Sequence, residues 1–543
     1  MGTLTAQVLL ISFAAIFLWR MIRFVAFRRS LAHIPGPRRA SWWTGSLLQL
    51  YDPEGWGFHE DLYRKYGGVA RLDLMFGDQC LYVSDPLALH HICIKDQDAY
   101  EETDKFLTIY RLIFGPSLLA TLGDDHRRQR KLLNPAFSLQ HMRNLLSVFY
   151  PIAHKLCAVL EGEISKGTHC IDVMNWTSRA ALEYVGQGGL GYSFDALDES
   201  QTNEYSDALK DFQPLLFRLD LFLRIIPEAV KVGSSAFRRK VIEMVPWAPV
   251  KSLVKIVDTI ERRSKDILQR KRVALMKGDK GLQAQIGNGK DVMSVLMRAH
   301  LTAYGTSALP ESELLAHMST IVVAGHDTTA SAVSRILHIL SQHPEAQSRL
   351  RDEVTAARKE YGDLDYDKLM ALPYLDAVCR ETMRVDPPVA LLDRIVRKDT
   401  VLPLLWPIKS ADGKEIREIC LKKGTSIYIS ILGANRSRAI WGDDADDWKP
   451  ERWLKPLPHS VEDAHLPGVY SQMMTFLGGP RACIGFKFSE IEMKMILSML
   501  LEKFVFEPGP EIYWQMGALY HPVVKSEDRH KVQAPLKVSL VDK

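Results

Sequence analysis

The sequence predicts a mainly α-helical protein with one small β-rich region. Three stretches show the length and apolar pattern of helices: Glu311–Gln342, Leu372–Val385 and Phe488–Leu501. Near the amino terminus, a short helical pattern from His59 to Tyr66 is followed by two apolar, strand-like pieces, Val69–Phe76 and Cys80–Val83. Helices therefore dominate, and the early strands are expected to form the β-rich region.

Composition places the chain among ordinary globular proteins. The 543 residues are compatible with one large domain, and a net charge of +4 argues against a dedicated nucleic-acid-binding protein. The seven cysteines are an odd number, scattered without C-x-x-C spacing. This usage indicates a reducing compartment and no disulfide framework.

The amino terminus has the pattern of a membrane anchor. Leu4–Trp19 is almost entirely apolar, and a helix of this length is about 24 Å long. The span can be extended to cross the ~30 Å hydrocarbon core if the side chains of Arg20 and Arg23 snorkel to the interface. No Lys or Arg precedes this stretch, so the positive-inside rule places the rest of the chain in the cytosol. A cleaved signal peptide is the alternative, but its usual basic start is absent. We expect an anchor with a basic flank over residues 1–34 and one large domain over residues 35–543.

A glycine-rich loop, Phe476-Leu-Gly-Gly-Pro-Arg-Ala-Cys-Ile-Gly485, leads into the third predicted helix. Glycines let a large planar ligand approach the backbone closely. Convergent N–H groups at a helix start favour a thiolate, and Arg481 adds a cation two residues from Cys483. The loop therefore predicts a permanently ionised sulfur bound to a soft metal, with a buried structural cysteine as the alternative.

This loop resembles the heme-binding loop of the cytochrome P450 superfamily, Phe-x-x-Gly-x-Arg-x-Cys-x-Gly. The matching residues are Phe476, Gly479, Arg481, Cys483 and Gly485. The resemblance implies the cytochrome P450 fold, here preceded by one amino-terminal transmembrane helix. It also implies heme b as cofactor, with Cys483 as axial ligand of the iron and with Phe476 and Arg481 in contact with the cofactor.

The long apolar helix Glu311–Gln342 contains Ala324-Gly-His-Asp-Thr-Thr329. Glycine and paired threonines are poor choices inside a helix, which suggests a functional reason for their presence. Threonine hydroxyls can bond back to carbonyls one turn earlier and bend the helix. The stretch resembles the oxygen-activation motif of the family. That resemblance implies that Thr328 hydrogen-bonds the bound oxygen and that Asp327 connects it to bulk protons.

Two further segments resemble heme-contacting positions of the family. His126 and Arg130 lie one turn apart in a basic helix that starts at Gly123, a pattern that a solvated basic face would also explain. The resemblance implies that both contact heme propionates, although the first position is commonly Trp and His126 is a departure. Arg394 matches another propionate contact.

Glu381 and Arg384 lie three residues apart on one helix face, and Pro450-Glu-Arg-Trp453 follows later in the chain. A surface pair of this kind contributes little. In the family, the Glu-x-x-Arg pair is buried and joined by the later arginine, here Arg452. The resemblance implies that the three residues form a structural clamp without a catalytic role.

The resemblance implies a heme-thiolate monooxygenase that inserts one oxygen atom from O2 into a lipophilic small molecule. Candidate substrates are terpenoids, steroids, fatty acids and xenobiotics, and the Asp125–Phe137 run resembles fungal members of secondary metabolism or detoxification. Terpenoid-type oxidation is the favoured option. The expected electron source is a separate membrane-bound NADPH-cytochrome P450 reductase in the endoplasmic reticulum, with cytochrome b5 as a possible auxiliary. A candidate docking face for this partner consists of Arg127, Arg128, Lys131 and Lys487.

Two alternatives remain open. A heme-thiolate isomerase or dehydratase would need no reductase and usually lacks the Asp327–Thr328 pair. A heme sensor would bind the cofactor without NADPH-dependent turnover.

Overall fold

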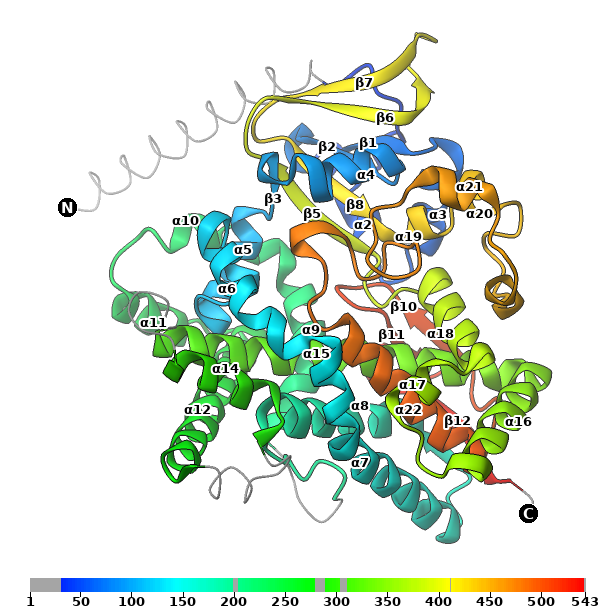
Figure 1. Cartoon of the computed structure of the whole chain (residues 1–543). Helices are drawn as coiled ribbons and strands as arrows, with labels where there is room; N and C mark the ends of the chain where they lie inside the picture. Colours follow the sequence, from blue (N-terminus) through cyan, green and yellow to red (C-terminus); the bar gives the residue numbers. More distant parts are fainter. Residues whose placement is uncertain (1–30, 199–203, 279–288, 303–309, 411, 542–543) are drawn as a thin grey trace. The chain divides into compact units, whose positions relative to one another are not determined.

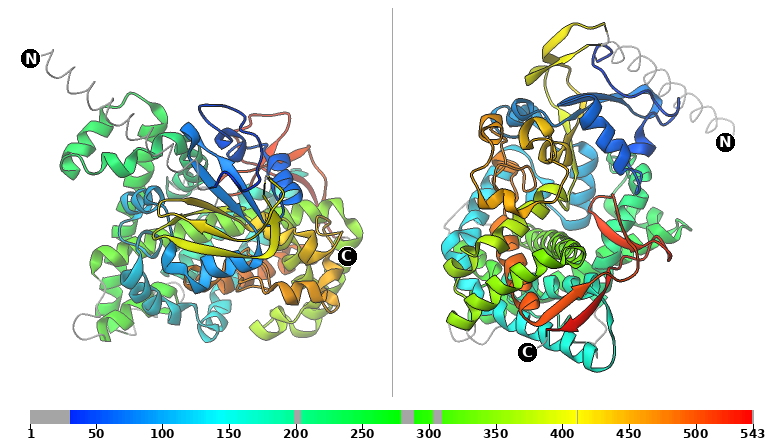
Figure 2. Two further views of the ribbon diagram at one scale, coloured as in Figure 1. Left: turned by 90° about the horizontal axis from the view of Figure 1, so that it is seen from above. Right: turned by 90° about the vertical axis from the view of Figure 1, so that its right-hand side faces the viewer.

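The structure, a computed structural model, describes residues 31–198, 204–278, 289–302, 310–410 and 412–541. The chain forms two compact units, which are described separately here. The first comprises residues 31–102, 391–445 and 458–481, and the second comprises 103–390, 446–457 and 482–541. In Figures 1 and 2 the first unit is therefore blue and yellow to orange.

A five-stranded sheet organises the first unit. Its strand order is β1-β2-β8-β5-β3, with β1 (Val69–Asp73), β2 (Gln79–Val83), β3 (Tyr100–Glu101), β5 (Leu391–Val396) and β8 (Ser426–Ser430). Every residue of β2 is buried, and this strand pairs with antiparallel β1 on one side and with parallel β8 on the other. A central strand covered on both faces is expected to be apolar throughout, as this one nearly is.

Both strands predicted near the amino terminus are present, but the first is shorter than expected. It ends at Asp73 because Met75–Gly77 forms a 3-10 turn in which Phe76 takes a left-handed φ of 54°. This turn reverses the chain into β2. The predicted short helix is α3 (Trp56–Lys65).

The remaining elements of the first unit surround the sheet. A long hairpin of β6 (Thr400–Lys409) and β7 (Glu415–Leu421) projects beyond it, as Figures 1 and 2 show. The helices are α2 (Leu47–Leu50), α4 (Pro86–His90), α19 (Ile431–Asn435), α20 (Arg438–Trp441) and α21 (His459–Ala464). Leucines of α2 and α3 join side chains of β1, β2 and β8 in one buried cluster.

The second unit is helical, and its centre is the predicted long helix, α15 (Glu311–Gln342). Two other predicted helices are present as α18 (Pro373–Val385) and α22 (Phe486–Lys503). Helix α15 packs against α8 (Val173–Tyr184), α12 (Ala248–Met276) and α22. The other helices are α5 (Asp104–Phe114), α6 (Gly123–Leu133), α7 (Leu139–Ser165), α9 (Glu204–Leu223), α10 (Ile226–Ala229), α11 (Ser235–Glu243), α14 (Val292–Thr302), α16 (Pro344–Tyr361) and α17 (Tyr366–Met370).

Two small sheets complete the second unit. One has the order β4-β12-β9, with β4 (Cys170–Asp172), β9 (Phe504–Glu507) and β12 (Pro535–Leu540), and the other pairs β10 (Ile512–Gln515) with β11 (His521–Val524). The mainly α architecture with small sheets agrees with the fold class predicted from the sequence.

Among the described residues, α7 alone is long and apolar enough to cross a membrane, and 56% of its most apolar window is buried within the protein. This burial is what a core helix shows. The predicted anchor, Leu4–Trp19, lies outside the described residues.

Candidate active site

The backbone of the cysteine loop is held by close contacts that only glycine permits. A Cβ on Gly478 would collide with the carbonyl oxygen of Pro467, and one on Gly479 would collide with that of Cys93. Gly479 also takes a left-handed φ of 69° and begins a 3-10 turn that ends at Arg481. The path of the loop therefore depends on the motif residue Gly479 and on its neighbour Gly478.

Cys483 follows this turn and precedes Gly485, the N-cap of α22. Its side chain is accessible to solvent, yet the surrounding protein desolvates the sulfur and raises the pKa of the thiol. The Gly485 N–H and the charge of Arg130 act in the opposite direction but are smaller effects.

In the chain without a metal, burial therefore outweighs the helix start in its effect on the pKa of this thiol, and the predicted metal-bound thiolate stays a prediction. A coordinated metal ion deprotonates such a thiol outright. The nearby cation is Arg130, whereas Arg481 lies against Glu102, with its Nη2 3.0 Å from the carboxylate.

The Ala324–Thr329 motif lies at a stretch of α15 where side chains are solvent-exposed, although most of this helix is buried. Ala324 is exposed and Thr328, one turn later, is half-buried, while their neighbours Val323, His326 and Thr329 are buried. The Thr328 hydroxyl donates to the Ala324 carbonyl at 2.8 Å, which is the back-bonding expected from the sequence. A small residue and a hydroxyl thus line an open stretch of the helix.

Asp327 lies beside two histidines that the sequence reasoning did not single out. Its Oδ1 is 2.8 Å from Nδ1 of His326, and Nε2 of His326 is 2.8 Å from the hydroxyl of Ser178 on α8. His521, the first residue of β11, is close enough for Asp327 to raise its pKa, although burial lowers that pKa more strongly. No local sequence signal could have identified His521, because it joins Asp327 only through the tertiary fold.

Helix α6 carries the two predicted propionate contacts on one face. His126 is buried, and Arg130 is half-buried and donates from Nη1 to the carbonyl oxygen of Ala482. The pKa of Arg130 is lowered, because the effect of burial is larger than the opposing effect of the charge of the Cys483 sulfur. Arg130 is therefore a cation directed at the residue adjoining Cys483.

In the first unit, the other predicted cofactor contacts gather around one carboxylate. Arg394 of β5 and Arg481 both form ion pairs with Glu102, at 3.4 and 3.0 Å, and all three side chains are less than a tenth exposed. Two buried guanidiniums thus share one carboxylate. Phe476 is half-buried and packs edge-to-face on Tyr470.

The three residues of the predicted clamp meet in the second unit. Glu381 and Arg384 are fully buried and joined at 2.8 and 2.9 Å, and Arg452 reaches Glu381 at 3.4 Å. The indole of Trp453 and the N–H of Lys449 also donate to the same carboxylate. Glu381 therefore accepts hydrogen bonds from its own helix and from the 446–457 stretch, and it ties α18 to that stretch.

Helix α22 holds a buried carboxyl that the sequence reasoning overlooked. Glu492 is fully buried, and neither of its oxygens has a hydrogen-bond partner among the residues that the structure describes. Burial raises its pKa well above the usual value. Its position one turn after Phe488, which packs on Phe149, is the sequence signal that could have indicated an inward-facing side chain.

Replacing Glu492 with glutamine is expected to stabilise the protein above neutral pH. With its raised pKa, the native carboxyl keeps a proton that the unfolded chain loses above pH ~4.3, so this group lowers the free energy of unfolding by up to about 1.4 kcal/mol per pH unit as pH rises. Urea denaturation at pH 5 and at pH 8 should show that the free energy of unfolding falls less between these two pH values in the variant than in the parent. An unchanged pH slope would contradict a protonated Glu492, and the control is Glu507→Gln, which changes an exposed carboxylate at the end of β9.

The residues fit a heme cofactor. In the second unit, Cys483 supplies an accessible sulfur and α15 has an uncovered stretch with a hydroxyl. In the first unit, taken by itself, the guanidiniums of Arg394 and Arg481 have the chemistry that binds carboxylates such as propionates. An accessible cysteine at the start of one helix and an oxygen-activation motif in another, both in a mainly helical protein, define a heme-thiolate oxidoreductase.

Comparison with known proteins gives the family. The family model for cytochrome P450 matches residues 35–513. Cytochrome P450 monooxygenase 219 of Postia placenta is 47% identical over 512 residues, covering 94% of each chain, and monooxygenase 212 of the same fungus is 47% identical over 528 residues, covering 96% of each. The ganoderic acid synthetase CYP5150L8 of Ganoderma lucidum is 41% identical over 531 residues, covering 97% of each. The chain therefore belongs to the cytochrome P450 family, whose members are oxidoreductases that incorporate molecular oxygen.

Proposed function

We propose that the chain is a membrane-anchored monooxygenase that inserts one oxygen atom from O2 into a lipophilic small molecule of the terpenoid class. The observation that carries the proposal is the Asp327–Thr328 pair at the uncovered stretch of α15, since a heme-thiolate isomerase or a heme sensor has no use for a proton supply there. The name of the relative from Ganoderma lucidum supports a terpenoid substrate in fungal secondary metabolism.

The proposed cofactor is heme b, with Cys483 as its axial ligand. Arg130, Arg394 and Arg481 are the proposed propionate contacts, together with buried His126, and Phe476 adjoins the cofactor. Heme held by a cysteine thiolate supplies the chemistry of O2 activation and C–H oxygenation. Residues 35–543 would form the heme domain.

The chain's own contribution is to hold and deliver protons. The hydroxyl of Thr328 has a carbonyl acceptor at Ala324, so it can switch its hydrogen bond from that carbonyl to an oxygen atom in the open stretch. Asp327 is 15% exposed and contacts His326, which places it between the buried helix and solvent. Asp327 would therefore pass protons inward while the apolar surroundings exclude bulk water.

Replacing Thr328 with alanine is expected to lower the yield of product per NADPH consumed by about tenfold or more, because proton delivery by a positioned group contributes at least this much. The measurement compares NADPH oxidation, O2 uptake, peroxide and product in the reconstituted enzyme. Thr329→Ala is the matched control, because that hydroxyl contacts Ser489 at 3.1 Å instead. Unchanged coupling in the Thr328 variant would remove the role proposed for this residue.

The proposed location is the endoplasmic reticulum membrane, with a single pass over residues 1–34 and the catalytic part in the cytosol. In the second unit, large apolar side chains are exposed along the stretch from α9 to α11, and these are Phe222, Ile225, Val232, Phe237, Val241 and Met244. Exposed apolar side chains gathered in one stretch mark an interaction or membrane-contact site. In the same stretch Leu216 and Leu219 are buried, so α9 also covers the core.

The proposed redox partner is NADPH-cytochrome P450 reductase, with cytochrome b5 as auxiliary. On α6, Arg127 and Lys131 are exposed, and the pair that Arg127 forms with Asp124 at 2.7 Å is itself exposed and therefore weak. Arg128 instead pairs at 2.7 Å with Glu313, whose side chain is only 11% exposed. We therefore assign docking to the first two residues rather than to Arg128.

The test of the proposed function is reconstitution of the full chain with the reductase and a panel of terpenoids, steroids and fatty acids. NADPH-dependent formation of a product that carries one 18O atom from 18O2 is the expected result. Turnover without NADPH would favour the isomerase, and no turnover with any lipophilic class despite heme binding would favour the sensor.

A further inference from the structure

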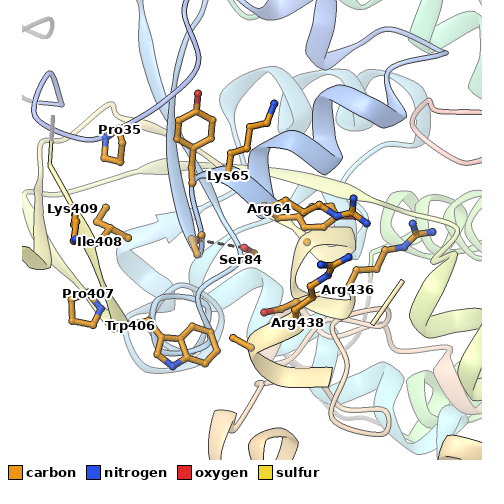
Figure 3. A pocket seen from close by; sticks show the side chains of 17 residues that line it. Pro35, Arg64, Lys65, Ser84, Trp406, Pro407, Ile408, Lys409, Arg436 and Arg438 are labelled. Atoms are coloured by element: carbon orange, nitrogen blue, oxygen red, sulfur yellow. Dashed lines mark hydrogen bonds between the residues drawn. The ribbon is translucent and has the colours of Figure 1, made fainter. Parts of the chain in front are cut away.

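A cavity of about 560 Å³ lies within the first unit, between the end of α3, strand β6 and the turn that joins α19 to α20. Figure 3 shows Arg64, Arg436 and Arg438 on one side of it, with Pro35, Trp406 and Lys409 on the other. This volume is that of a small-molecule site.

The lining of the cavity is strongly cationic. It contains five positively charged side chains and neither aspartate nor glutamate. These side chains are Arg64, Lys65, Lys409, Arg436 and Arg438. Arg64 and Lys65 also pair with Glu60 and Asp61 one turn back on α3, but exposed pairs of this kind are weak and exchange readily. The cavity therefore presents an electrostatic field that favours an anion.

The walls of the cavity are held in place independently of any ligand. Asp85 accepts hydrogen bonds from the N–H groups of Leu405 and Trp406 and from Ala88 at the start of α4, which attaches β6 to the sheet. On another side, the N–H of Gly433 donates to the Ser430 hydroxyl at 2.9 Å. A preformed cationic site avoids the entropic cost of ordering its wall on binding.

Exposed aromatic side chains follow Pro35 of the cavity wall a few residues later in the same segment of the chain, 35–43. Trp42 and Trp43 are 60% and 61% exposed, and Phe76, which packs on Trp43, is 43% exposed. The carbonyl of Pro35 accepts from Arg71, and the carbonyl of Trp43 accepts from Phe76, so the segment is fixed along β1 and the turn that follows it. Exposed Trp and Phe are typical of side chains at the level of lipid headgroups.

We propose that this cavity binds the phosphate of an anionic phospholipid headgroup. Guanidinium groups match phosphate oxygens in bidentate geometry, and a cavity of this size has room for the glycerol that follows a phosphate. In the sequence, Pro35 of the cavity wall directly follows the expected anchor and its basic flank, residues 1–34. The headgroup would hold the first unit against the membrane surface.

The experiment titrates the heme-loaded full chain in neutral detergent with three probes: dioctanoyl phosphatidic acid, dioctanoylglycerol and inorganic phosphate. Thermophoresis measures each affinity at two salt concentrations. The double variant Arg64→Gln/Arg438→Gln removes two lining cations, and Arg417→Gln/Lys422→Gln removes two paired cations of the same unit outside the cavity. A carbon-monoxide spectrum checks that each variant is folded and loaded.

The expected result is that phosphatidic acid binds at least about tenfold more tightly than dioctanoylglycerol or inorganic phosphate, and that the Arg64/Arg438 variant loses about tenfold in affinity while the Arg417/Lys422 variant does not. Inorganic phosphate binding as tightly as phosphatidic acid would overturn the lipid assignment in favour of a free phosphate. Equal affinity in wild type and the Arg64/Arg438 variant, or equal loss in both variants, would overturn the site itself.

Discussion

Replacing Cys483 with serine is expected to abolish the red-shifted Soret band of the reduced carbon-monoxide complex and to eliminate oxygenation. Serine has a hard hydroxyl that remains protonated and cannot supply the thiolate electron density on which this chemistry depends. The side chain of Cys483 is accessible, and the N–H of Gly485 is placed to donate to the atom at this position. The substitution therefore removes the sulfur ligand without disturbing the packing around it.

The measurement is the difference spectrum of the purified full chain, recorded with heme content and far-ultraviolet circular dichroism. Cys420→Ser is the matched control because Cys420 is also exposed but lies on β7 of the hairpin. A red-shifted band that persists in the Cys483 variant would show that another residue holds the iron. The catalytic assignment would then fall with it.

Replacing Glu381 with glutamine is expected to lower the free energy of unfolding by about 3–5 kcal/mol. Glu381 is fully buried, pairs with Arg384 and Arg452, and accepts from Trp453. Removal of its charge leaves two guanidiniums buried with no carboxylate between them, and the desolvation cost of both is then uncompensated.

Glu451→Gln provides the comparison, since this neighbouring carboxylate pairs with Arg349 at a site where both side chains are 51% exposed. A change of about 0–1 kcal/mol is expected there. Urea denaturation of both variants measures the difference. Should Glu381→Gln fail to accumulate, Arg452→Gln removes one of the two cations and is expected to give a smaller loss. Equal stability of the Glu381 and Glu451 variants would show that the clamp contributes no more than a surface pair.

The part of the candidate site that lies on α15 could be predicted from local sequence patterns. The bounds of α15 agree with the prediction because its apolar pattern is long and Pro310 and Pro344 flank it. Thr328 makes the back-bond predicted for it, since that contact depends on a carbonyl only four residues away.

Other features of the site were not predictable in this way. The raised pKa of the Cys483 thiol depends on how much protein surrounds the sulfur, and the loop sequence contains no measure of that burial. The partner of Arg481 is likewise remote, because Glu102 lies more than 350 positions earlier in the chain. The electrostatic effect of Asp327 on the pKa of His521 also depends on the path of the carboxy-terminal strands.

By itself, the sequence determined the helical class, the cysteine loop with its glycines, the Asp327–Thr328 pair and the residues of the clamp. The first three follow from local spacing and from motifs that carry their own chemistry, whereas the clamp with Arg452 was expected from the resemblance to the family. Only the tertiary structure decided that Glu492 is a buried carboxyl without a partner, that Arg394 and Arg481 share Glu102, and that five cations from three segments line one cavity. The physical reason is that desolvation and ion pairing depend on neighbours in space, and chain folding brings those neighbours from distant parts of the sequence.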